Sequence, residues 1–149
     1  MKYNADHFEV DGALRDIYVF DTSIHEWRLM MSSLPALGAE VTLSVDPNST
    51  IDDPAIDPAD LFALLEKDED ASATLTITVG NITFWCYFFR AHEMEFTFDP
   101  QLVRSADDFV NLEGFMKWLG KSCRRRVVMT MEGVGDASIP PLLEYVPQA

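Results

Sequence analysis

The stretch that decides the fold is residues 75–89, which read LTITVGNITFWCYFF. Up to Val79, aliphatic side chains alternate with threonine, which is the period-two pattern of a β-strand with one buried face. The Gly80-Asn81 pair suits a two-residue hairpin turn of type I′ or II′, and the apolar run from Ile82 to Phe89 predicts the returning strand. Because both faces of that run are largely apolar, we expect a central strand that is covered on both sides or meets a partner on one side.

The segments around this hairpin add further strands. Residues 93–98 read EMEFTF, an alternation that predicts a third strand and, with the hairpin, an antiparallel meander. Enrichment in β-branched and aromatic side chains predicts strands at residues 14–20, 41–45 and 127–131. His7, Glu9 and Asp11 alternate with apolar residues, and we interpret them as the solvent-facing side of an edge strand.

Capping patterns predict four helices, which begin near residues 24, 58, 106 and 140. Pro35 and Gly38 are expected to end the first helix, and Gly120 is expected to stop the third. The chain has no internal repeat and no linker long enough to separate two domains. We therefore expect one α+β domain over residues 1–149, with a mostly antiparallel sheet of about five to six strands and helices packed on it.

The net charge of −14 is concentrated in the first half, where residues 1–74 carry 16 acidic and 4 basic side chains. Such a field repels nucleic-acid phosphates and anionic membrane surfaces, so a charged macromolecular partner is expected to be a basic protein. No apolar run reaches the ~20 residues of a membrane span, and the N-terminus has no targeting pattern. With only two cysteines, expected to be reduced, the chain is predicted to be cytoplasmic.

The candidate partner-binding surface lies in residues 46–70, where nine acidic side chains accompany one lysine. This prediction requires that Arg124, Arg125 and Arg126 do not cover the acidic segment, while the alternative is that the acids only keep the protein soluble. Trp85 is the proposed aromatic anchor because tryptophan is enriched at binding hot spots. The acidic candidates in this surface are Asp52, Asp53, Asp57, Asp60, Glu66, Asp68, Glu69 and Asp70.

Other groups with chemical potential are weaker candidates. The segment from His92 to Asp99 could bind a metal through His92, Glu93, Glu95 and Asp99, although strand alternation puts His92 on the face opposite the two glutamates. Cys123, which precedes three arginines, would have a lowered pKa if it were exposed. No nucleophile elbow or phosphate-binding glycine loop is present, so no cofactor and no catalytic residue is predicted.

Several of these segments together resemble a known kind of protein: LRDIYV at residues 14–19, the Trp27 helix, FWCYFF at 84–89, EMEF at 93–96 and Asp99-Pro100. They are similar to small acidic bacterial proteins, some of which lie in toxin-immunity gene neighbourhoods. The resemblance implies a non-enzymatic binding role. The leading prediction is a cytoplasmic protein-binding module of the immunity type that neutralises a basic partner. The alternatives are a homo-oligomeric accessory or structural protein, for example a homodimer that covers the strand at 82–89, and a metal-dependent enzyme using the segment from His92 to Asp99.

Overall fold

The predicted hairpin forms the second and third strands of the sheet in the computed structural model, which describes residues 1–47, 53–134 and 138–148. Strands β3 (Ser72–Val79) and β4 (Ile82–Tyr87) are joined by Gly80 and Asn81. Gly80 has φ 60° and Asn81 does not have positive φ, which identifies the type II′ form of the turn. Strand β5 (Glu93–Phe98) pairs with β4 and completes the predicted antiparallel meander.

The described residues form one antiparallel sheet of seven strands in the order β2-β3-β4-β5-β1-β6-β7. The outer strands are β2 (Glu40–Asp46) and β7 (Leu143–Tyr145), and β1 (Arg15–Phe20) lies between β5 and β6 (Val127–Met131). The predicted α+β class is confirmed. The predicted number of strands is one short because β7 was expected to be helical.

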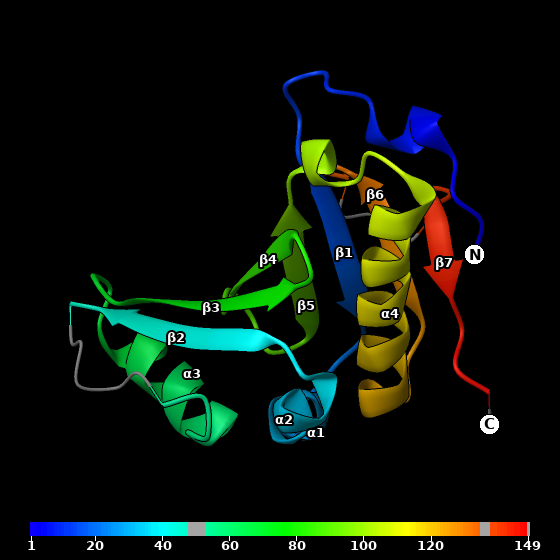
Figure 1. The fold of residues 1–149 in the computed structure, drawn as a ribbon. Helices are drawn as coiled ribbons and strands as arrows, with labels where there is room; N and C mark the ends of the chain where they lie inside the picture. Colours follow the sequence, from blue (N-terminus) through cyan, green and yellow to red (C-terminus); the bar gives the residue numbers. More distant parts are fainter. Residues whose placement is uncertain (48–52, 135–137, 149) are drawn as a thin grey trace.

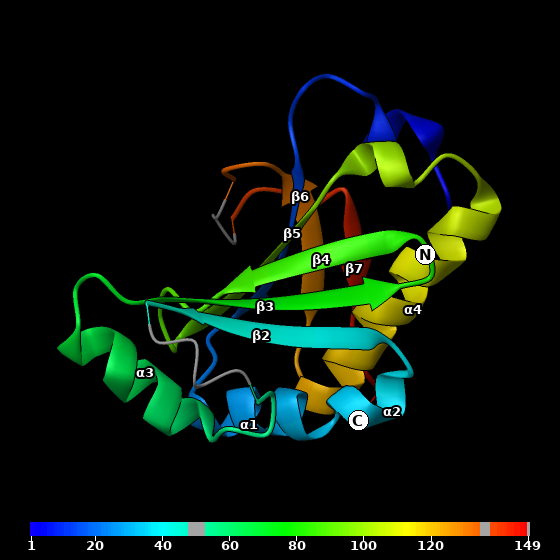
Figure 2. The same ribbon diagram turned by 60° about the vertical axis from the view of Figure 1, so that its left-hand side comes forward.

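The helices pack on one face of this strongly twisted sheet, as Figures 1 and 2 show. They are α1 (Ile24–Ser32), α2 (Leu34–Leu37), α3 (Pro58–Lys67) and α4 (Ala106–Cys123), with short 3-10 turns at Ala5–Phe8 and Pro100–Leu102. None of the helices in the described ranges combines the length and the hydrophobicity that a membrane-spanning helix requires. On the covered face, Phe115 of α4 stacks on Phe84 at 3.9 Å between ring centroids and meets Phe96 edge to face.

The opposite face of the sheet is not covered by any described helix. Strand pairing places one row of side chains across this open face, and the row consists of Thr42, Thr76, Trp85, Thr97, Asp16 and Thr130. The two faces of β4 are therefore unlike, since Phe84 is buried whereas Tyr87 is exposed. Of the two alternatives for β4, coverage on both sides is wrong, because every described helix packs on the side that carries the large aliphatic and aromatic side chains. A partner on its other side stays a prediction.

The C-terminal segment corrects two predictions. Residues 143–145 form β7 instead of a terminal helix, because the outer edge of β6 offers backbone partners and the Leu142 N–H donates to the Met129 carbonyl at 2.8 Å. Helix α4 continues through Gly120 to Cys123 and ends where Arg124 adopts a left-handed conformation. Gly120 serves packing, because a Cβ atom there would lie 2.6 Å from the Tyr145 ring.

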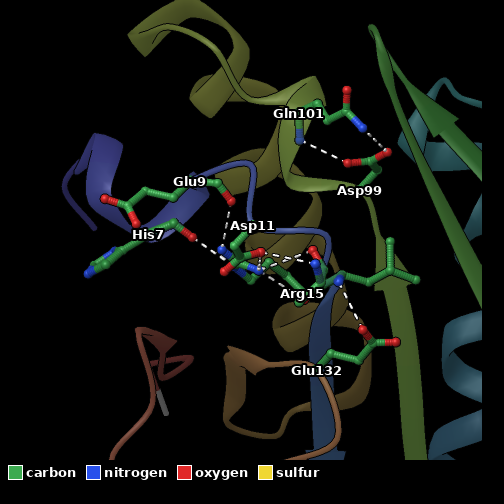
Figure 3. Close-up of polar contacts among 9 residues, drawn as sticks. His7, Glu9, Asp11, Arg15, Asp99, Gln101 and Glu132 are labelled. Atoms are coloured by element: carbon green, nitrogen blue, oxygen red, sulfur yellow. Dashed lines mark hydrogen bonds and ion pairs between the residues drawn. The ribbon is translucent and has the colours of Figure 1, made fainter.

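The N-terminal segment is held by one buried arginine (Figure 3) instead of by sheet pairing. Arg15, which is 1% exposed, donates hydrogen bonds to the carbonyl oxygens of His7 (2.8 Å), Glu9 (3.2 Å), Ala13 (3.3 Å) and Leu14 (3.0 Å). The segment containing His7, Glu9 and Asp11 is thus not the predicted edge strand. Its carbonyl groups converge on one guanidinium, which presents five N–H donors in a fixed fork.

Candidate functional site

Helix α3 carries the candidate acidic surface, and its sequence explains its placement. Asp57 caps the helix by accepting the Ala59 N–H, and Pro58 occupies the first helical turn, where no backbone donor is needed. Leu61 is fully buried, and Phe62 meets Trp27 of α1 edge to face at 5.0 Å between ring centroids. One side of α3 is thus fixed to the core, which leaves its charged side toward solvent.

The acidic candidates within the described residues lie at the surface, with Asp68 half-buried and the others exposed. Asp52 lies outside the described residues. Three of the candidates also have local structural roles, because the carboxylates of Asp53, Asp57 and Asp68 each accept a backbone N–H two residues further on. The remaining candidates make no ion pair with any described residue, and they are Asp60, Glu66, Glu69 and Asp70.

The basic cluster after α4 does not neutralise this acidic surface. Arg125 lies 3.6 Å from the carboxylate of Glu26, and Arg126 forms an ion pair with Glu144. Arg28 is the described arginine that binds the acidic surface, through two hydrogen bonds to Asp57 at 3.1 and 3.2 Å. These bonds, with the Ala59 N–H, hold the pKa of Asp57 below its ordinary value. Among the described residues, none of the three arginines after α4 forms an ion pair with the acidic surface.

An exposed aromatic pair lies directly beside α3. Strand β4 ends at Tyr87, after which Phe88 turns into the core against Trp27 and Phe62 while Phe89 turns outward. Phe89 is 67% exposed and stacks on Tyr87, which is 41% exposed, with ring centroids 5.5 Å apart. The two rings together form one contiguous exposed aromatic patch, and aromatic side chains are enriched at protein interaction sites.

A cavity of about 530 Å³ joins the aromatic pair to the acidic helix. Its walls come from α3, from the start of β3 and from the segment after β4, and they include Phe62, Leu65, Glu66, Tyr87, Phe88 and Phe89. Glu66 brings an acidic group to the cavity, and Glu69 and Asp70 follow it in the sequence next to the lining residue Ala71. An apolar hollow beside unpaired carboxylates suits a partner that carries an apolar side chain flanked by basic ones.

The segment that carries Phe89 is fixed in place by α1. The Trp27 indole N–H donates to the Ala91 carbonyl at 2.8 Å, and the Thr22 hydroxyl donates to the same oxygen at 2.7 Å. The Thr22 N–H also donates to the His92 carbonyl at 3.1 Å. Because these bonds tie the segment to the start of α1, Phe89 is presented on a supported backbone, which lowers the ordering cost of binding.

Comparison of the chain with protein-family models, with curated proteins and with solved structures finds no match. Tyr87 and Phe89 were not chosen from the sequence, which favoured Trp85. Trp85 is half-buried in the polar row of the open face, on the same side of β4 as Tyr87. The sequence carried no signal for this pair, because the apolar run from Ile82 to Phe89 predicts one continuous strand, whereas β4 ends at Tyr87.

The proposed metal candidates are not gathered into one site. Glu93 and Glu95 share the open face of β5, His92 is exposed in the turn before it, and Asp99 caps the following 3-10 turn by accepting from the Gln101 backbone and side chain. Within the described ranges, no three histidine, cysteine, aspartate or glutamate side chains are placed to hold a metal ion.

Neither cysteine has the environment of a reactive thiol. Both are free and buried. Burial and the negative charge of Glu26, only partly opposed by Arg125, raise the pKa of Cys123 to about 12. The exposure that a lowered pKa at Cys123 required is absent, because the side chain lies on the buried side of α4, where a thiolate would be removed from solvent.

The carboxylate of Asp16, which is buried although it belongs to the row on the open face, influences the pKa of Glu95. Asp16, which is 2% exposed, accepts hydrogen bonds from the Tyr18 hydroxyl (3.2 Å), the Thr97 hydroxyl (3.0 Å) and the Gly133 N–H (2.9 Å). Glu95 lies beside this network, where its Oε1 accepts from the same Tyr18 hydroxyl at 3.4 Å. Partial burial, and then the charge of Asp16, raise the pKa of Glu95.

We expect Glu95→Gln to stabilise the protein at neutral pH. A raised pKa in the folded state means that the protonated form is favoured there, so Glu95 contributes stability at acidic pH and loses that contribution as the pH rises through its folded-state pKa. The advantage of the glutamine variant should therefore shrink as the pH falls through the raised folded-state pKa of Glu95, and it should be smallest below the ordinary glutamate value. Urea unfolding midpoints of both proteins, measured from neutral to acidic pH, check this expectation. An advantage of equal size across the whole range would contradict it.

Proposed function

We propose that this chain is a non-enzymatic binding module of the immunity type, which captures and neutralises a basic partner protein. The observation that carries the proposal is the exposed Tyr87–Phe89 pair, placed beside an apolar cavity and the unpaired carboxylates of α3. The two free, buried cysteines are compatible with the reducing cytoplasm, where we propose that the protein acts.

The two parts of the surface have different physical tasks. The net charge of −14 and the carboxylates around α3 attract a cationic protein over a distance of about one Debye length, which raises the rate of association. Exposed charges add little to the final affinity because solvent screens them. Most of the binding free energy comes from burial of Phe89 and Tyr87. Truncation of a hot-spot aromatic side chain at the centre of an interface weakens the binding free energy by more than about 2 kcal/mol.

Phe89→Ser is expected to weaken partner binding at least about 30-fold, because it removes the central apolar contact of the proposed surface. The matched control is Val110→Ser, which changes an apolar side chain that is 62% exposed on α4. The measurement is capture of basic proteins from cells that produce the chain, followed by biosensor kinetics with the purified partner. The partner should bind the wild type and the Val110 variant equally.

Three outcomes would overturn this proposal. The first is a partner that binds the Phe89 and Val110 variants with the same affinity. The second is an association rate that does not fall when the salt concentration is raised, because charge steering is screened by salt. The third is a dimer of the chain in light scattering that Phe89→Ser converts to a monomer, since that result would assign the aromatic pair to the homo-oligomer alternative.

A further inference from the structure

Strand β2 has one side without a partner among the described residues. All seven of its residues pair with β3, and β2 ends the sheet. None of the backbone hydrogen bonds between described residues outside the ladders involves residues 40–46. An unpaired edge of this length presents a row of N–H and C=O groups that can accept another strand.

A cavity of about 740 Å³ lies against the first half of this edge. Ala39 and Val41 contribute one wall, α1 and α2 contribute Met31 and Leu34, and the segment before α3 contributes Ile56. Val41 is half-buried, whereas Leu43 and Val45 further along β2 are buried. Where the cavity meets β2, the covered face of the sheet thus lacks side chains that fill the space. A side chain projecting from an added strand on this face would enter the cavity.

We propose that β2 is a docking site for an extended segment of another protein, which adds to the sheet as an eighth strand. Main-chain hydrogen bonds to β2 would supply affinity, and alternate side chains would supply specificity. The side chains on one face of the segment are apolar, with one anchored in the cavity beside Val41. The side chains on the other face of the segment lie on the open face of the sheet. The two that lie beside Glu40 and Asp46, at the ends of β2, are basic.

A second copy of this chain is a poor occupant of the same edge. Antiparallel pairing of β2 with itself about Leu43 would place Glu40 opposite Asp46 at both ends. Like charges directly opposite each other on neighbouring strands are destabilising. Charge complementarity therefore favours a different chain that has lysine or arginine at positions six residues apart, and it opposes self-association through this edge.

The test uses a synthetic heptapeptide, KVTLTVK, with blocked ends and a fluorescent label. Its apolar residues alternate with polar ones, and its symmetry lets either strand direction place lysine beside Glu40 and Asp46. We expect saturable binding to the purified chain at about 10–100 µM, measured by fluorescence anisotropy. Absence of saturable binding up to about 1 mM would overturn the proposal.

Two controls separate strand addition from simple charge attraction. Methylation of alternate backbone nitrogens gives two peptides with unchanged side chains. One set of nitrogens faces β2 and the other faces away, so one peptide should bind at least about tenfold more weakly while the other binds like the parent. Equal binding of both methylated peptides and the parent would overturn the proposal.

The double variant Glu40→Lys, Asp46→Lys should bind KVTLTVK about five- to tenfold more weakly and should bind EVTLTVE in its place, because the cross-strand charges are exchanged. For each peptide, the Val110→Ser variant should have the same affinity as the wild type. Thermal melting should show that every variant is folded. An unchanged peptide preference in the double variant would overturn the proposal. The titration needs only the chain and the peptide, so its result is separate from whether a partner is found for the Tyr87–Phe89 pair.

Discussion

Replacement of Arg15 by alanine is expected to lower the free energy of unfolding by about 3–5 kcal/mol. The guanidinium is buried and satisfies four backbone carbonyl groups between His7 and Leu14, and its Nη1 also lies 3.5 Å from the carboxylate of Asp11. Truncation leaves those carbonyl groups without their donor and releases the segment that packs Phe8 against Phe109. Urea unfolding of the two proteins measures the difference.

Arg15→Lys tests whether charge alone is sufficient. A lysine keeps the positive charge but has three donors on one nitrogen, so it cannot reach carbonyl groups on both sides of the fork. We expect most of the loss to remain. Arg104→Ala is the control, because Arg104 also donates to a backbone carbonyl, that of Gln101, but is exposed. Arg104→Ala should lower the free energy of unfolding by no more than about 0.5 kcal/mol. An equally small loss for Arg15→Ala would contradict the role assigned to the buried guanidinium.

Trp27→Ala is expected to be the second large loss, at about 3–5 kcal/mol. Trp27 is fully buried, its ring contacts Phe62 of α3 and Phe88 after β4, and its indole N–H bonds to Ala91. The same side chain thus supports both halves of the proposed partner-binding surface. Besides a lower urea midpoint, we expect faster hydrogen exchange in α3 and at residues 88–92 than in the wild type.

The matched control for this prediction is Trp85→Ala. Trp85 is also a tryptophan, but it is half-buried on the open face of the sheet. Its replacement should cost no more than about half as much, because less apolar area returns to water. Trp27→Phe should recover part of the loss by filling the space without restoring the bond to Ala91. A Trp27→Ala protein that keeps the wild-type exchange rates in α3 would disprove the supporting role.

The predictions that came true rest on local patterns. Alternation before Gly80 and the turn preference of Gly80-Asn81 correctly predicted the β3–β4 hairpin, and the Ser23, Asp57 and Ser105 caps correctly predicted three helix starts. Those signals involve side chains and backbone groups within a few residues of each other. The exposure of the acidic residues was also predictable in outline, because carboxylates without basic partners are rarely buried.

The errors arise where a distant part of the chain decides the local structure. Residues 143–145 form β7 because the outer edge of β6 offers backbone hydrogen-bond partners. The segment around His7 is not a strand, because its carbonyl groups accept hydrogen bonds from the Arg15 guanidinium. Phe89 could be identified as a candidate anchor only after the end of β4 and the inward turn of Phe88 were known.

The sequence by itself determined the α+β class, the meander at the centre of the sheet and the concentration of negative charge before residue 75. Only the tertiary structure decided which face of the sheet is open, which aromatic side chains remain exposed and which acids lack a basic partner. The physical reason is that hydrogen-bonded turns and caps form between neighbours in sequence, whereas burial and ion pairing depend on which distant surfaces the folded chain brings together.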